Sequence, residues 1–93
     1  MWSDLPEKSL QTALGALLAK HRKNRGLTQS QLAEKAGIGT ATLVRLENSG
    51  QSNLDNFLRV LRALRLLDGL EEGLTVPAKS PLEQLQERER ERR

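Results

Sequence analysis

The stretch from Gln29 to Asn48 constrains the fold of this chain more than any other segment. Two small residues, Ala33 and Gly37, stand four positions apart in it, and Gly37 can adopt the positive φ that a tight turn between helices needs. The positions that two crossed helices would bury are all apolar: Leu32, Ala36, Ile38, Leu43 and Leu46. A lone Ala-x-x-x-Gly is common, but the complete pattern predicts a helix-turn-helix.

Local signals mark where the two helices of this motif begin and end. Thr28 is a good N-cap, and Gln31 three residues later completes a capping box. Gly37 ends the first helix, and either Gly39 or Thr40 is placed to cap the second. Both boundaries therefore agree with the apolar pattern.

Two flanking segments carry apolar residues at helical spacing. In the first, expected over residues 8–24 and ended by Gly26, they are Leu10, Leu14, Leu17 and Leu18. In the second, which begins at Asn53 or Leu54, they are Leu54, Phe57, Leu58, Leu61 and Leu64. A short fifth helix follows, capped by Asp68 or Glu71 and closed by Gly73. We therefore expect an all-α chain that folds as a five-helix bundle.

Length and composition exclude several classes of protein. With 93 residues, the chain has room for one domain with tails. The absence of Cys and the single His argue against disulfides, a thiolate metal site and a zinc site. No apolar run is long enough to span a bilayer, and no secretory signal is visible. The lack of a membrane span and of a secretory signal leads us to expect a cytoplasmic location on the bacterial nucleoid. Because the sequence has neither a Gly-rich phosphate loop nor a believable catalytic triad, we also expect no enzyme and no cofactor.

The positive charge is concentrated in the first half of the chain. The net charge is +3, and residues 1–48 hold seven Lys or Arg against four Asp or Glu, whereas residues 49–93 hold eight of each. Four cations crowd together near the end of the first helix: Lys20, Arg22, Lys23 and Arg25. Such a patch suits phosphate. An ordinary basic helix terminus explains it equally well.

Three segments follow from these patterns: an N-terminal arm over residues 1–7, a helix-turn-helix domain over 8–76 and a charged C-terminal tail over 77–93. Pro77 and Pro81 interrupt the chain where the tail begins, and beyond Leu82 and Leu85 it alternates Glu with Arg. We expect this tail to be frayed or disordered alone, and to order only against a partner. A purely solubilising role is the alternative.

Two motifs resemble the Xre or Cro/cI-type family of regulators. They are Gly-Leu-Thr-Gln-Ser-Gln-Leu-Ala-Glu-Lys-Ala-Gly-Ile at residues 26–38, and Arg-Leu-Glu-Asn at residues 45–48. The resemblance covers about Leu10 to Leu66. It implies the lambda-repressor-like DNA-binding fold, with the third helix in the major groove and no metal or catalytic activity.

The resemblance also implies roles for individual residues. Base edges would be contacted by residues of the third helix: Thr40, Ala41, Thr42 and Arg45. Phosphates would be contacted by residues around the motif: Gln29, Asn48, Lys20, Lys23 and Arg25. Arg22 and Glu47 would form a structural ion pair. Because Gly39, Thr40 and Ala41 stand where many relatives carry Ser, Arg or Gln, readout would depend on Arg45 bonded to guanine, on methyl contacts and on DNA shape.

A second resemblance concerns the later part of the chain. Residues 53–70, and Ser-Pro-Leu-Glu at residues 80–83 with its basic end, are similar to HipB-like antitoxins. Such proteins pair with HipA-type serine/threonine kinase toxins and repress the toxin operon as dimers. The predicted function is thus a homodimeric, sequence-specific repressor of a palindromic DNA operator, acting as an autoregulating antitoxin. A stand-alone regulator of phage or restriction-modification origin, and an interaction module that no longer binds DNA, are the alternatives.

Overall fold

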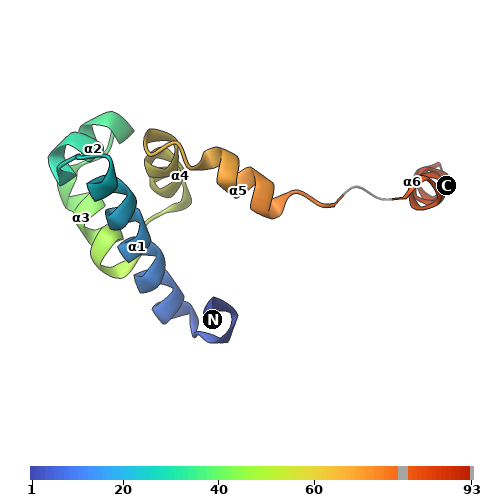
Figure 1. Cartoon of the computed structure of the whole chain (residues 1–93), viewed down its shortest axis with the longest axis horizontal. Coiled ribbons are helices and arrows are strands. Elements are labelled where there is room, and N and C mark those ends of the chain that lie inside the picture. Colours follow the sequence, from blue (N-terminus) through green and yellow to red (C-terminus); the bar gives the residue numbers. More distant parts are fainter. Residues whose placement is uncertain (78–79, 93) are drawn as a thin grey trace.

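The structure, a computed structural model, describes residues 1–77 and 80–92, and all regular secondary structure in these ranges is helical (Figure 1). A short 3₁₀ helix, Trp2–Asp4, precedes six α-helices: α1 Glu7–Asn24, α2 Gln29–Ala36, α3 Thr40–Ser49, α4 Leu54–Ala63, α5 Leu67–Leu74 and α6 Pro81–Glu91. The described ranges contain no strand. The all-α prediction is confirmed, with one helix more than the five expected.

Local capping sets the boundaries of α2 and α3. The Thr28 hydroxyl accepts a hydrogen bond from the Gln31 backbone N–H at 3.1 Å, and the Gln31 side-chain oxygen accepts one from the Thr28 N–H at 2.8 Å. This arrangement confirms the predicted capping box. Gly37 ends α2 with a φ of +71°, and Gly39 in extended conformation is the N-cap of α3. The turn between the helices therefore has the geometry that its two glycines predict.

The core lies where α1, α2, α3 and α4 meet. Its buried residues come from all four helices and from Leu64, the C-cap of α4. They are Leu18, Leu32, Ala33, Ala36, Leu43, Leu46, Val60, Leu61 and Leu64. Helix α1 crosses α3 at Gly15, where a Cβ atom would overlap the carbonyl oxygen of Leu46. Because the two backbones touch here, α1 holds α3 at a fixed distance and angle.

Two residues of the predicted apolar stripes are largely exposed. Leu17 on α1 is 41% exposed and Leu54 at the start of α4 is 69% exposed, whereas Val60, which the predicted stripe omitted, is fully buried. Compared with the stripe expected from the sequence, the side of α4 that packs on the core is therefore rotated toward Val60 and Leu64. This rotation leaves Leu54 on the outer side of the helix.

Helix α5 begins and ends at residues other than those expected. Its N-cap is Leu66, with no side-chain cap, and it runs through Gly73 to Leu74. The preceding turn places Arg65 in the left-handed region with a φ of +59°, and the Leu66 N–H donates to the Leu61 carbonyl at 2.8 Å. This turn brings Leu66, Leu67 and Leu70 against the core. The position where α5 begins is therefore set by apolar packing and not by a polar N-cap.

Helix α6 lies in the segment for which a frayed or disordered tail was expected. The Ser80 hydroxyl accepts from the Glu83 N–H at 3.3 Å, and Pro81 occupies the first turn, so two local signals start the helix. All its described residues are exposed, and it lies apart from the bundle (Figure 1). Ala78, Lys79 and Arg93 of the predicted tail lie outside the described residues. No helix in the described ranges has both the length and the apolar character that crossing a membrane requires.

Candidate nucleic-acid interface

Helix α3 presents one continuous face to the solvent. Thr40, Ala41, Arg45 and Asn48 are exposed and Val44 is half-buried, and at about 100° per residue these five share one side of the helix. The opposite side is buried, since Leu43, Leu46 and Glu47 lie in the interior. The exposed side carries hydroxyl, methyl, guanidinium and amide groups, which are the groups that contact base edges in a major groove.

Thr42 is half-buried at the edge of that face. It lines a polar hollow of about 320 Å³ between α3 and the start of α4, together with Arg45, Gln51, Ser52, Asn53 and Asn56. The Asn53 side chain caps α4 by accepting from the Asn56 N–H at 2.7 Å. The hollow thus joins the exposed face of α3 to a helix N-terminus, which favours anions.

Three residues of this hollow were missed by sequence reasoning: Gln51, Ser52 and Asn56. For Gln51 and Ser52 the available signal was the stretch Ser-Gly-Gln-Ser-Asn at residues 49–53, whose residue types by themselves indicate only a loop and a helix cap. Their importance depends on their lying beside Arg45, which the linear sequence does not reveal.

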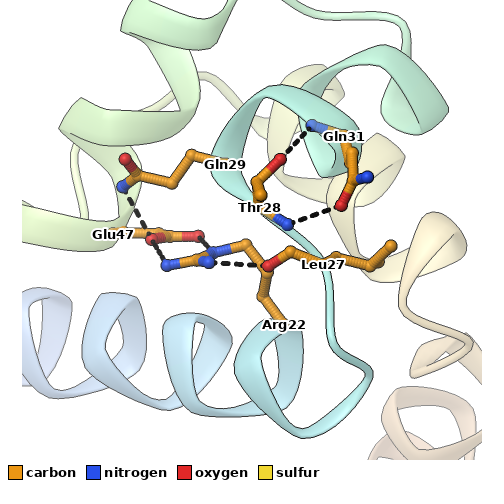
Figure 2. A network of polar contacts seen from close by, with 6 residues as sticks. All are labelled: Arg22, Leu27, Thr28, Gln29, Gln31 and Glu47. Atoms are coloured by element: carbon orange, nitrogen blue, oxygen red, sulfur yellow. Dashed lines mark hydrogen bonds and ion pairs between the residues drawn. The ribbon is translucent and has the colours of Figure 1, made fainter.

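A buried ion pair fixes the inner side of α3 (Figure 2). Arg22 of α1 donates from Nε to Glu47 Oε2 at 2.8 Å and from Nη2 to Glu47 Oε1 at 3.1 Å. Its Nη1 donates to the Leu27 carbonyl in the loop before α2, at 2.8 Å. Arg22 is 8% exposed and Glu47 is 5% exposed, so water reaches neither group well.

Gln29 joins the same network. Its Nε2 donates to Glu47 Oε1 at 3.0 Å, so α1, α2 and α3 are connected through one carboxylate (Figure 2). One hydrogen on Nε2 and the side-chain oxygen remain, and the Gln29 backbone N–H belongs to the open first turn of α2. The residue is half-buried, with its amide beside the N-terminus of the helix. This arrangement holds an oriented set of hydrogen-bond donors at one end of α2.

The remaining basic residues are distributed around the end of α1. Lys20, Lys23 and Arg25 are exposed, whereas Arg22 is turned into the network. Lys20 lines a shallow hollow with Trp2 and Leu17 on the outer side of α1. At about 100° per residue it points nearly opposite to Arg22. The cluster seen in the sequence is therefore divided between an internal pair and separate surface cations.

The fold and this surface define a helix-turn-helix protein of the Xre type, with α2 supporting and α3 presented outward. The family described as "Helix-turn-helix" matches residues 18–68, more than half of the chain, and the chain belongs to that family. It is also similar to an uncharacterized HTH-type transcriptional regulator of Methanothermobacter thermautotrophicus. The two are 43% identical over 49 residues, which cover 52% of this chain and 71% of the relative. Together these matches place the chain among HTH-type transcriptional regulators, a DNA-binding class.

Proposed function

We propose that this chain is a sequence-specific transcriptional repressor that binds a palindromic operator as a homodimer. One observation carries the proposal: α3 exposes Thr40, Ala41 and Arg45 on one side, while the Glu47 network fixes the other side. A rigid recognition helix can enter a major groove without losing much conformational entropy. A single motif contacts few base pairs, so paired half-sites supply the remaining affinity.

Within this proposal, the residues divide into two roles. Arg45 reads a guanine, Thr40 and Ala41 contact methyl groups, and Thr42 contributes from the edge of the face. Phosphates are held by Gln29 and Asn48, by Lys23 and Arg25 at the end of α1, and by Gln51, Ser52 and Asn56 of the polar hollow. Lys20, on the outer side of α1, lies away from this surface. Arg22 and Glu47 contact no DNA and hold α3 in position.

Two substitutions separate the reading role from the positioning role. Arg45→Ala is expected to weaken binding to the preferred site by about 1–3 kcal/mol and to leave binding to random DNA nearly unchanged. Gln29→Ala is expected to weaken binding to both DNAs alike, because a phosphate carries no base identity. Fluorescence anisotropy on a DNA site selected by the unsubstituted chain measures both effects.

The matched control removes the same charge elsewhere. Arg88→Ala on the exposed helix α6 is expected to leave affinity for both DNAs within the error of the assay. If Arg45→Ala instead weakens preferred and random DNA equally, Arg45 contacts the backbone, and base reading belongs to Thr40, Ala41 or DNA shape.

We further propose that the regulator acts on the bacterial nucleoid as the autoregulating antitoxin of a HipA-type serine/threonine kinase toxin. The similarity of residues 53–70 and 80–83 to HipB-like antitoxins supports this role. So does α6, whose Leu82 and Leu85 are 64% and 53% exposed and lie one turn apart, as in helices that dock into a partner groove. An adjacent gene for a kinase of this type would support the antitoxin role, and its absence would favour a stand-alone regulator.

A further inference from the structure

The outer side of α4 carries a stripe that the bundle leaves uncovered. Leu54 is 69% exposed, Leu58 is half-buried and Arg62 is exposed, and successive members are four residues apart. Residues with this spacing lie next to one another along one side of a helix. The stripe is thus an apolar pair followed by a cation.

Helix α5 carries a second uncovered surface. It extends from α4 away from α1, α2 and α3 (Figure 1). Leu70 is half-buried and Leu74, one turn later, is 73% exposed, while Glu71 lies beside them. A Cβ atom added at Gly69 or Gly73 would meet nothing within 4 Å, so the backbone of α5 is open to close approach by another helix.

The charges on these two helices are complementary. Helix α5 carries Asp68, Glu71 and Glu72 and no basic residue, while Arg59 and Arg62 lie on α4 and Arg65 follows it. Arg59 is paired with Asp55, but within residues 1–77 and 80–92 neither Arg62 nor Glu71 has an ion pair. A partner of uniform charge would meet like charges on one of the two helices. A second copy of the chain presents both signs. A two-fold axis can place the acidic α5 of each copy opposite the basic residues of α4 in the other copy.

We propose that α5 of one chain packs across α4 of a second copy, related by a two-fold axis. Leu70 and Leu74 of one protomer lie against Leu54 and Leu58 of its partner, with Glu71 facing Arg62. The symmetry uses each contact twice, which increases the buried area and the effect of each charge pair. The inference rests on the proposed dimeric repressor and specifies the surface that makes the dimer.

Charge reversal in the full chain tests this arrangement, with sedimentation velocity as the readout. Arg62→Glu and Glu71→Arg are each expected to raise the dimer dissociation constant about tenfold, since each symmetric dimer gains two like-charge contacts. The double variant is expected to return to within about threefold of the original, because the swapped pair is restored. Glu72→Arg is the matched control. It makes the same charge change on another side of α5, and it is expected to leave the constant within about threefold of the original.

Three outcomes overturn the inference. They are single variants that dimerise like the original chain, a double variant whose losses add, and a control variant that weakens the dimer as much as Glu71→Arg. Leu74→Asp gives a second readout that does not depend on charge pairing between Arg62 and Glu71, and it is expected to leave the chain monomeric at micromolar concentration. Circular dichroism establishes that each variant is folded. If these substitutions leave the dimer dissociation constant unchanged but the chain still binds a palindromic site, the interface lies elsewhere and the proposed function stands.

Discussion

Replacing Glu47 with alanine is expected to lower the free energy of unfolding by about 3–5 kcal/mol, because it leaves the Arg22 guanidinium buried without its partner. The loss also removes the acceptor for Gln29 Nε2, so α1, α2 and α3 lose their common contact. Urea denaturation followed by circular dichroism measures the change, with the m-value as a check that unfolding remains two-state. The affected helix is the one that would read DNA, so affinity for every DNA is expected to fall with stability.

A matched control shows whether burial or bond length determines how much an ion pair contributes to the free energy of unfolding. Asp55 and Arg59 on α4 form an ion pair of the same 2.8 Å length, but both side chains are largely exposed. Asp55→Ala is therefore expected to cost no more than about 1 kcal/mol. An equally small loss of unfolding free energy for Glu47→Ala would mean that water solvates the Arg22 guanidinium in place of Glu47, and that the network does not fix α3.

Gly50→Ala is expected to destabilise the fold by about 2–5 kcal/mol, for two separate reasons. Gly50 ends α3 with a φ of +72°, where a side chain is strained by about 1–2 kcal/mol. A Cβ atom there would also overlap the backbone carbonyl of Gln11 on α1, and overpacking of this kind costs about 1–3 kcal/mol. Thermal unfolding is expected to shift by about 4–8 °C for each kcal/mol lost.

Gly26 offers the control that isolates the steric contribution. It has a φ of +68°, almost the same as that of Gly50, yet a Cβ atom there would meet nothing within 4 Å. Gly26→Ala therefore reports the backbone strain alone, about 1–2 kcal/mol. If both substitutions cost the same, α1 and α3 do not meet closely at Gly50 in solution.

The motif itself was predictable because its signals are local. The capping box of Thr28 and Gln31, the turn at Gly37 and the buried positions of α2 and α3 follow from residues at most a few positions apart. The beginning of α4 after its N-cap Asn53 was visible for the same reason. Such features are set by short-range hydrogen bonds and by helical periodicity.

Features that depend on distant contacts were not predictable from local patterns, and the pair of Arg22 and Glu47, 25 positions apart, was expected only through the family resemblance. The hydrogen bond from Gln29 to Glu47 joins residues 18 positions apart, and the sequence indicated only a polar residue at a helix start. The turn before α5 uses Arg65 in a conformation that usually takes glycine, so no sequence signal marked it. The rotation of α4 toward Val60 likewise depends on how α2 packs against it.

Selection of binding sites from a random pool of duplex DNA tests the central claim most directly. The full chain is incubated with the pool, bound DNA is recovered over several rounds, and the enriched sequences are aligned. We expect an inverted repeat whose half-site centres are about 10 base pairs, or one helical turn, apart. Selection with Arg45→Ala is expected to return the same repeat with the preference lost at one base pair of each half-site. A pool that remains random after selection, or that enriches only unpaired sites, would contradict a dimeric, sequence-reading repressor.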